Sequence, residues 1–368
     1  MEQNKILLFI KIPPPITGAT LMNKRVRDSV ILNENFNLRS ICISYKKDLS
    51  ETGSYTMKKI ILIILVILRL LKELLFYRPS FVYYQISPVG VAFLRDLCFV
   101  IIIKIFRTKI VYHIRGQGIE EQSKVKWKKK LYEYAFHNSE IICLSKLLTY
   151  DIKNVFNGII HIVNNGIPDA DNIFISGTQK KNNKEIIILY LSNLSESKGI
   201  FEFIDALSLI DKKRYKFQVK IVGSDGTFSY NDLLDIIRNK NLQNKIVYVG
   251  PKYGTDKHKI LAQSDILVFP TRNDAFPGVL LEALQFSLPI ISTKEGAIPE
   301  IVDEGITGFL VDKNRPDQIA DKLDVLIKSP ELRKQMGEAG RKKYLQRYTL
   351  EKFERNMKNV FEDILSRQ

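Results

Sequence analysis

Two acidic side chains in the C-terminal half have the types and spacing of a sugar-binding site. Asp274 and Glu282 lie within segment 269–283, Phe-Pro-Thr-Arg-Asn-Asp-Ala-Phe-Pro-Gly-Val-Leu-Leu-Glu-Ala. The apolar run before this segment is typical of a buried strand, and a helix is predicted to begin near Gly278. Two carboxylates so placed can accept hydrogen bonds from different hydroxyl groups, while the amides at the start of the helix can hold phosphate oxygens.

A lysine earlier in the same half has the features of a diphosphate contact. Lys198 directly precedes Gly199, after which a helix is predicted from about Ile200. An ammonium group beside the positive end of a helix dipole is suited to an anion. The alternative is a solvated lysine at a turn, together with a capping aspartate and a solvated glutamate further on. That alternative explains each residue singly but not their combination.

The N-terminal half offers weaker candidates. The loop 13–20 contains three prolines and Gly18, which lets a ligand approach the backbone before a helix expected from about Leu21. His113 and Arg115 share one face of a predicted strand end, where either could reach a sugar or its acceptor. A histidine in the core is the alternative for His113. Neither GxGxxG nor GxxxxGK[ST] occurs, which argues against a dehydrogenase and a P-loop NTPase.

These residues must be positioned by short apolar runs that alternate with amphipathic stretches, twice along the chain. Such a pattern predicts parallel strands covered by helices on both faces. The polar segment 176–184 is the best linker candidate, and the pattern past Pro316 is helical throughout. The predicted strands are Lys5–Ile10, Arg39–Ser44, Phe81–Gln85, Lys109–His113, Ile141–Leu144, Ile160–Val163, Glu185–Leu191, Phe217–Val222, Ile246–Val249, Ile266–Phe269 and Ile290–Ser292.

The predicted fold class is therefore α/β, with two Rossmann-like, doubly wound parallel-sheet domains facing a central cleft. A length of 368 residues suits two domains. We place the domains at residues 1–172 and 173–345, and expect residues 346–368 to form a C-terminal helix that packs back on the first domain. Ligands of such sheets bind beyond the carboxyl ends of the strands.

Charge and apolar runs limit the partners. Residues 1–170 carry a net charge of +12 out of +16 for the chain, which favours an anionic partner on that side. The apolar runs 60–68 and 98–103 are too short to span a bilayer, for which about 20 residues are needed. They predict either buried helices or, with Lys58, Lys59 and the basic segment 124–130 around Trp127, peripheral contact with an anionic membrane.

Other features narrow the class of protein. A nucleic-acid-binding protein would interleave basic and aromatic residues on one face, which Trp127 alone does not supply. Segment 1–10 does not have the pattern of a signal peptide, so a cytoplasmic protein is expected. Cys42, Cys98 and Cys143 have neither metal nor CxxC spacing, so we expect a reducing compartment and three buried side chains.

The segment from Asp274 to Glu282 resembles the acid-x7-Glu signature of the retaining glycosyltransferases of family 4, which have the GT-B fold. Further motifs occur in family order, and the resemblance is strongest over residues 189–311. These motifs are Asn165-Gly-Ile, Lys198-Gly, Val222-Gly-Ser-Asp-Gly, Ala297-Ile-Pro-Glu-Ile-Val and Gly305-Ile-Thr-Gly-Phe-Leu-Val.

The resemblance implies transfer of a sugar from a nucleoside-diphosphate sugar, most commonly a UDP-sugar, with retention and without a metal or other cofactor. Lys198 would bind the diphosphate, Asp274 the sugar hydroxyls and Glu282 the ribose. The N-terminal domain would bind the acceptor, and the next domain the donor. The implied catalytic residues are Asp274, Lys198, His113 and Arg115. The implied donor site comprises Gly18, Asn193, Lys198, Gly223, Arg272, Asp274, Phe276, Pro277, Gly278, Val279, Leu280 and Glu282.

The chain departs from the family pattern in four places. Asn193 replaces a diphosphate-binding arginine, for which Arg272 is the expected substitute. Asp274 replaces a glutamate and is one methylene shorter. Ser287 replaces a glycine, and Arg115 replaces a histidine.

The preferred function is that of a transferase in bacterial surface polysaccharide synthesis, with a glycan or lipid-linked acceptor at the inner face of the plasma membrane. The alternatives are a nucleotide-sugar-binding scaffold with impaired catalysis, suggested by Asn193 and Arg115, and a GT-B nucleotide-sugar epimerase.

Overall fold

The chain forms two compact units in the computed structural model, which describes residues 3–43, 57–170, 185–213 and 215–368. Unit 1 comprises residues 1–166 and 351–368, and unit 2 comprises residues 167–350. The predicted boundary at residue 172 and the predicted linker 176–184 lie outside the described residues.

Unit 1 is built on a parallel sheet with the strand order β2-β1-β3-β4-β5-β6. The central strands are buried on both sides, which explains their continuous apolar sequences. Because the chain runs outward from β1 to β2 and then returns to β3, the direction of the strand order reverses between β1 and β3. The strands are β1 (Lys5–Ile10), β2 (Asn37–Cys42), β3 (Phe81–Tyr84), β4 (Lys109–Ile114), β5 (Ser139–Cys143) and β6 (Ile160–Ile162).

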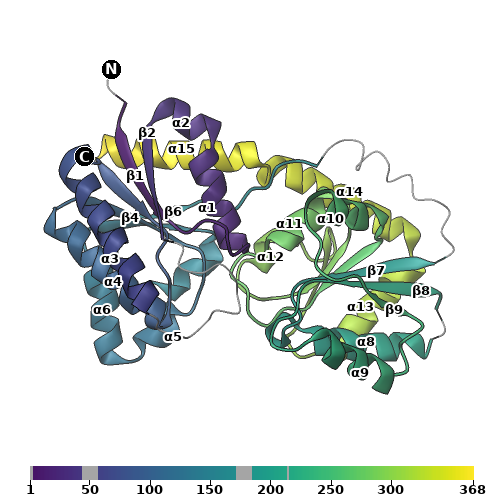
Figure 1. The fold of residues 1–368 in the computed structure, drawn as a ribbon. Coiled ribbons are helices and arrows are strands. Elements are labelled where there is room, and N and C mark those ends of the chain that lie inside the picture. Colours follow the sequence, from purple (N-terminus) through teal and green to yellow (C-terminus); the bar gives the residue numbers. More distant parts are fainter. Residues whose placement is uncertain (1–2, 44–56, 171–184, 214) are drawn as a thin grey trace. The chain divides into compact units, whose positions relative to one another are not determined.

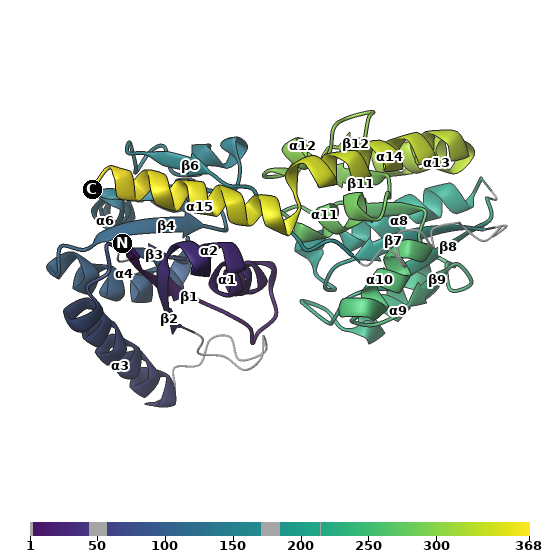
Figure 2. The same cartoon turned by 90° about the horizontal axis from the view of Figure 1, so that it is seen from above.

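Helices cover both faces of this sheet, with α3, α4 and α6 on the side opposite to α1 (Figure 1). The C-terminal helix α15 runs along unit 1 (Figure 2), where Phe361 forms edge-to-face contacts with Phe36, Phe81 and Tyr83. The helices are α1 (Gly18–Asp28), α2 (Val30–Asn35), α3 (Met57–Lys72), α4 (Gly90–Ile105), α5 (Ile119–Ser123), α6 (Lys126–Phe136) and α15 (Leu350–Ser366), with a π-helical turn at Glu73–Tyr77 and a 3-10 turn at Lys146–Asp151.

Unit 2 repeats this architecture with the strand order β12-β11-β10-β7-β8-β9, and all strand pairs are parallel. The strands are β7 (Ile186–Leu191), β8 (Phe217–Val222), β9 (Ile246–Tyr248), β10 (Ile266–Phe269), β11 (Ile290–Thr293) and β12 (Gly308–Val311). The helices are α8 (Ile200–Asp211), α9 (Tyr230–Asn239), α10 (Gly254–Gln263), α11 (Gly278–Gln285), α12 (Ile298–Ile301), α13 (Pro316–Lys328) and α14 (Pro330–Arg347), with a 3-10 turn at Glu196–Lys198.

The predicted α/β class and the two doubly wound sheets are confirmed, but β12 was not predicted. Its first residue is a glycine because a Cβ atom on Gly308 would lie 2.1 Å from the carbonyl oxygen of Ile290 on the neighbouring strand β11. Glycine weakens the strand signal in a sequence. The close approach of the two backbones requires this glycine, and the glycine is the reason that the sequence pattern did not indicate β12.

One expectation about burial is wrong, and of the two alternatives for the apolar run 60–68, full burial does not hold. Of the three cysteines, Cys143 is buried, Cys42 is partly exposed and Cys98 is exposed. The apolar run 60–68 lies in α3, but Ile61, Leu62 and Leu68 in this run are exposed. The reason is that only one side of α3 contacts the sheet, whereas its sequence is apolar on nearly all sides.

Candidate functional site

The candidate site in unit 2 lies at the carboxyl edge of the sheet, where β7 and β10 are neighbours. From β7 the chain proceeds outward to β8 and β9, and it then returns to the other side of β7 as β10. The loops after β7 and β10 therefore diverge from a point at which the strand order reverses. Such a switch point is where open α/β sheets bind their ligands.

Lys198 and Asp274 meet at this switch point. The Lys198 Nζ atom lies 2.7 Å from Asp274 Oδ2, although the two residues come from different loops. Thr271 Oγ1 lies 2.7 Å from the same carboxylate oxygen. Both charged side chains remain about a quarter exposed (25% for Lys198 and 21% for Asp274). A cation and an anion are thus held together within reach of a ligand.

The two loops can approach closely because the residue of the first loop that faces the second is Gly199. Gly199 has a φ of +73°, and a Cβ atom there would lie 2.0 Å from the carbonyl oxygen of Pro270. The Arg272 amide donates to the Ser197 carbonyl at 2.8 Å, which joins the loops a second time. Tyr190 lies on β7, just before the first of these loops. Burial raises the pKa of its hydroxyl, and the negative charges of Asp274 and Glu202 raise it further.

The N-terminus of α11 completes this edge. Pro277 is the N-cap residue, and no side chain caps the first turn, so the amides of Gly278 and Val279 are available to an anion. Phe276, Pro277 and Leu280 are buried and fix the position of the turn. Four residues into α11, the carboxylate of Glu282 lies 2.5 Å from Lys257 Nζ and is 21% exposed.

The remaining predicted donor residues of unit 2 have other partners. Arg272 contacts the carboxylates of Glu202 and, at 2.8 Å, Glu196. These ion pairs occupy the guanidinium, so its role as a substitute for the missing arginine stays a prediction. Asn193 is exposed and accepts a hydrogen bond from Ser224 at 3.0 Å. Gly223 is required by the fold, since a Cβ atom there would lie 1.8 Å from the Ser192 carbonyl oxygen.

Sequence reasoning missed the residues that hold the predicted ones in place. Thr271 precedes Asp274 by three positions and was within the motif, but a threonine carries no distinct signal. Lys257 and Glu202 lie on other helices, and their contacts with Glu282 and Arg272 arise only in the folded unit.

The candidates of unit 1 come from two different elements. Gly18 is exposed at the first residue of α1, with open space where a Cβ atom would lie. His113 has no exposed surface and contacts the Tyr83 hydroxyl through Nδ1 at 2.7 Å. The Arg115 guanidinium lies 3.3 Å from the same ring nitrogen, and the catalytic role of His113 stays a prediction. Burial and the charge of Arg115 hold the pKa of His113 well below its usual range.

Arg115 carries a buried charge that neutral groups surround. Its guanidinium donates to Asn23 Oδ1 at 3.1 Å, to Asn165 Oδ1 at 2.7 Å and to the Tyr83 hydroxyl at 3.3 Å. The residue is 9% exposed, and no carboxylate of the described residues pairs with it. A buried cation without a counter-ion is costly unless an anion neutralises it. Arg115 therefore has the electrostatics of an anion-binding residue.

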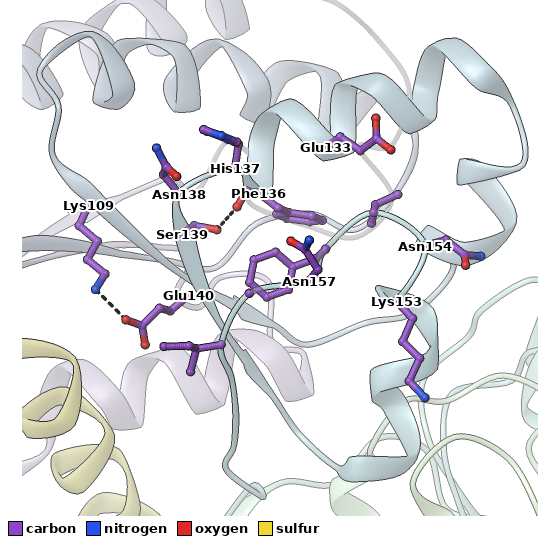
Figure 3. A pocket seen from close by; sticks show the side chains of 14 residues that line it. Lys109, Glu133, Phe136, His137, Asn138, Ser139, Glu140, Lys153, Asn154 and Asn157 are labelled. Carbon is purple, nitrogen blue, oxygen red and sulfur yellow. Dashed lines mark hydrogen bonds and ion pairs between the residues drawn. The ribbon is translucent and has the colours of Figure 1, made fainter. Parts of the chain in front are cut away.

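A cavity of about 850 Å³ in unit 1 lies at the opposite edge of the sheet, by the amino ends of β4 and β5 (Figure 3). The buried carboxylate at this cavity, Glu140, is already paired. Glu140 contacts Lys109 at 2.6 Å, His161 at 2.6 Å and Arg367 at 3.0 Å. This cluster attaches the end of the chain to the sheet, and we assign it a structural role.

Neither a metal centre nor a membrane-spanning helix is present among the residues that the structure describes. In the ranges that the structure describes, no group of three or more histidine, cysteine or acidic side chains is placed to hold a metal ion. Among the described helices, none is both long and apolar enough to cross a bilayer.

Comparisons with known proteins agree with this architecture. Residues 171–343 match the family model "Glycosyl transferases group 1". An uncharacterized glycosyltransferase of Methanocaldococcus jannaschii is 29% identical over 63% of this chain and 62% of its own length. The capsular polysaccharide biosynthesis glycosyltransferase CapM of Staphylococcus aureus is 32% identical over 44% of this chain and 42% of its own. The matched part of the chain thus spans about half the length of such curated relatives.

Solved structures share the fold over the whole chain. A glycosyltransferase from Rickettsia africae has a TM-score of 0.77 at 18% identity, with 100% of both chains covered. Anabaena HepE in complex with UDP has a TM-score of 0.74 at 15% identity, covering 98% of this chain and 100% of its own. At these identities the likeness shows the fold.

Proposed function

Because the chain belongs to the glycosyl transferases group 1 through residues 171–343 and has the GT-B fold, we propose that it transfers a sugar from a nucleoside-diphosphate sugar to an acceptor hydroxyl. The observation that carries this proposal is the meeting of Lys198 and Asp274 at the switch point of unit 2, beside the uncapped N-terminus of α11. Lys198 is complementary to a diphosphate, Asp274 to sugar hydroxyls and Glu282 to a ribose.

The ammonium of Lys198 and the first amides of α11 would neutralise the diphosphate as it departs. The bond from the anomeric carbon to the diphosphate breaks, and a bond to the acceptor oxygen forms on the same face of the sugar. The acceptor proton passes to the departing diphosphate. Attack on the same face gives retention of configuration. We propose that no metal is needed, because Lys198 and the helix N-terminus can supply the positive charge.

Asp274 would accept hydrogen bonds from the transferred sugar, and Glu282 from the ribose. Both carboxylates already contact a lysine, which holds each of them in a fixed place. We propose a UDP-sugar as the donor, on the analogy of the Anabaena structure with bound UDP. The donor screen described below tests this base and identifies the sugar.

Unit 1 would bind the acceptor. Arg115 is suited to a phosphate of that acceptor, since its own charge has only neutral partners. An acceptor with a lipid-linked diphosphate fits this requirement. The likeness to the Staphylococcus capsule enzyme supports a role in polysaccharide synthesis, and we propose that this takes place on the cytoplasmic face of the plasma membrane.

A donor screen tests the proposal directly. Thermal unfolding is measured with a panel of nucleoside-diphosphate sugars, and transfer or donor hydrolysis is then assayed with the donor that stabilises most. The Lys198→Ala variant should lose about 100-fold or more in kcat/KM for the donor, in the range found for single oxyanion-stabilising groups.

Lys240→Ala is the matched control, because Lys240 also pairs with an aspartate of unit 2, at 2.6 Å, but on the surface of α9 and α8. If Lys198→Ala binds and turns over the donor like the control, the proposed donor site is wrong. Donor binding without hydrolysis or transfer to any acceptor would indicate a binding protein instead.

A further inference from the structure

Unit 1 exposes many large apolar side chains on the outward sides of α3, α4 and α6. On α3 and the turn after it, the exposed residues include Leu65, Leu68 and Phe76, the last with 79% of its surface in contact with solvent. On α4 the exposed apolar positions are Val91, Leu94, Ile101 and Ile105. The full set, here called the α3–α4–α6 surface, is Ile61, Leu62, Ile64, Leu65, Leu68, Leu75, Phe76, Val91, Leu94, Ile101, Ile105, Val125, Trp127 and Tyr134.

These positions face the same side of unit 1. The inward sides of α3, α4 and α6 contribute to one core cluster through residues such as Leu70, Val100 and Phe136. The three helices also lie on one side of the sheet in Figure 1. On α4 the exposed residues recur at helical spacing, so they form a stripe directly opposite the buried one.

A small apolar cavity connects α4 with α6. It has a volume of about 200 Å³, and its lining includes the exposed residues Val91, Leu94 and Trp127 together with Leu131. Lys128 lies at the same cavity. An apolar recess beside an ammonium group matches an acyl chain below an anionic headgroup.

The charges around the surface are predominantly positive. Five exposed basic residues on or next to these helices form no ion pair with any residue that the structure describes, namely Arg69, Lys72, Arg107, Lys126 and Lys130. The exposed acids Glu121 and Glu133 are already paired, with Lys124 and Lys129 respectively. The net field at this surface therefore attracts anions.

We propose that the α3–α4–α6 surface docks on an anionic lipid bilayer. The apolar side chains would enter the boundary between headgroups and acyl chains, to a depth of about 5–10 Å for such helices. Trp127 suits this boundary, and the basic side chains would contact the headgroups. A second copy of the chain fits less well, because a two-fold contact would bring the same unpaired cations together.

This inference goes beyond glycosyl transfer and can fail independently of it. The test is flotation of the full chain with vesicles of phosphatidylcholine alone or with a quarter of phosphatidylglycerol. We expect binding to the anionic vesicles, a blue shift in the emission of Trp127, the single tryptophan of the chain, and loss of binding in high salt.

Two sets of variants separate the contribution of the apolar side chains to vesicle binding from that of the basic side chains. Leu65→Ser/Leu68→Ser/Phe76→Ser should reduce vesicle binding about tenfold or more, and Lys126→Gln/Lys130→Gln should reduce it on anionic vesicles selectively. Ile306→Ser/Val247→Ser, which removes exposed apolar side chains of unit 2, is the matched control and should bind like the parent chain. Donor-induced thermal stabilisation should be the same in all variants, which shows that unit 2 is intact.

Three outcomes would overturn the proposal. The first is equal binding by the α3 variant and its control, and the second is no preference for anionic over neutral vesicles. The third is a parent chain that is dimeric in sedimentation and becomes monomeric in the α3 variant without binding vesicles. That result would assign the surface to a second copy.

Discussion

At the scale of single residues, the charged groups of the candidate site in unit 2 have charged partners, whereas the candidate Arg115 of unit 1 has none among the described residues. Lys198 and Asp274 neutralise each other, as do Lys257 and Glu282. Binding of a donor would exchange these internal partners for phosphate and hydroxyl groups, so the site bears little unpaired charge when empty. Arg115 differs, because only neutral groups surround it.

The first residue-scale prediction concerns Arg115 and an anion. In a Lys198→Ala background, which weakens the donor site, pyrophosphate should raise the melting temperature, and the further change Arg115→Gln should abolish this rise. The reason is that a buried guanidinium gains most from a neutralising anion. Thermal unfolding with pyrophosphate at fixed ionic strength measures the effect. A rise of the same size in both variants would contradict it.

The second residue-scale prediction is a pH dependence due to His113. The unfolded chain protonates this histidine near pH 6.5, whereas the folded chain keeps it neutral because its pKa is well below the usual range. Below about pH 6.5 the unfolded state thus binds one more proton, and the free energy of unfolding falls as pH falls, by up to about 1.4 kcal/mol per pH unit.

The His113→Gln variant should lose this contribution, while its amide can still contact the Tyr83 hydroxyl. Denaturant unfolding of both proteins between about pH 7 and pH 5 measures the two slopes. Parallel slopes would show that His113 protonates equally well in the folded chain.

At the scale of elements, the site depends on the close approach of the loops after β7 and β10. Gly199 and Gly305 have the same φ, +73°, but a Cβ atom would meet the Pro270 carbonyl oxygen at 2.0 Å in the first case and nothing within 4 Å in the second. A side chain at Gly305 would therefore add backbone strain alone, whereas a side chain at Gly199 would add both backbone strain and a steric overlap.

Gly305→Ala should cost about 1–2 kcal/mol of stability, the penalty for the left-handed conformation. Gly199→Ala should cost more, because the loops after β7 and β10 must also move apart, and it should weaken donor binding by displacing Lys198 from Asp274. Urea unfolding and donor titration measure the two effects. Equal losses of stability and intact donor affinity would be evidence against a site assembled from these loops.

At the scale of the whole molecule, the chain returns to unit 1 after completing unit 2. Phe361 of α15 is fully buried against Phe36, Phe81 and Tyr83, all of unit 1. Phe361→Ala should therefore destabilise unit 1 by about 3–5 kcal/mol. Hydrogen exchange should show lost protection in β1 and β3 but unchanged protection in β7 and β10.

Asn359→Ala, an exposed change on the same helix, should alter neither set of strands. Equal loss of protection in both units after Phe361→Ala would mean that the units unfold as one. In that case α15 would stabilise the whole chain rather than unit 1.

The sequence by itself determined the fold class, most strand positions, and Lys198, Asp274 and Glu282 as candidates. Apolar periodicity and residues placed after strands are local features, and the carboxyl ends of parallel strands meet at one edge by geometry. Predicted and observed bounds coincide for β1, β8 and β10 and differ by one or two residues at an end for the other predicted strands, whereas β12 was not predicted.

Only the tertiary structure decided which partners these residues have and which surfaces stay exposed. The contact of Arg272 with Glu202, the burial of His113 and the strand β12 all depend on segments that are distant in sequence. The apolar run of α3 is the plainest case. An apolar sequence of this kind suits a helix that is buried on every side as well as one that is buried on one side. In the folded chain the sheet contacts only one side of α3, so the others stay exposed.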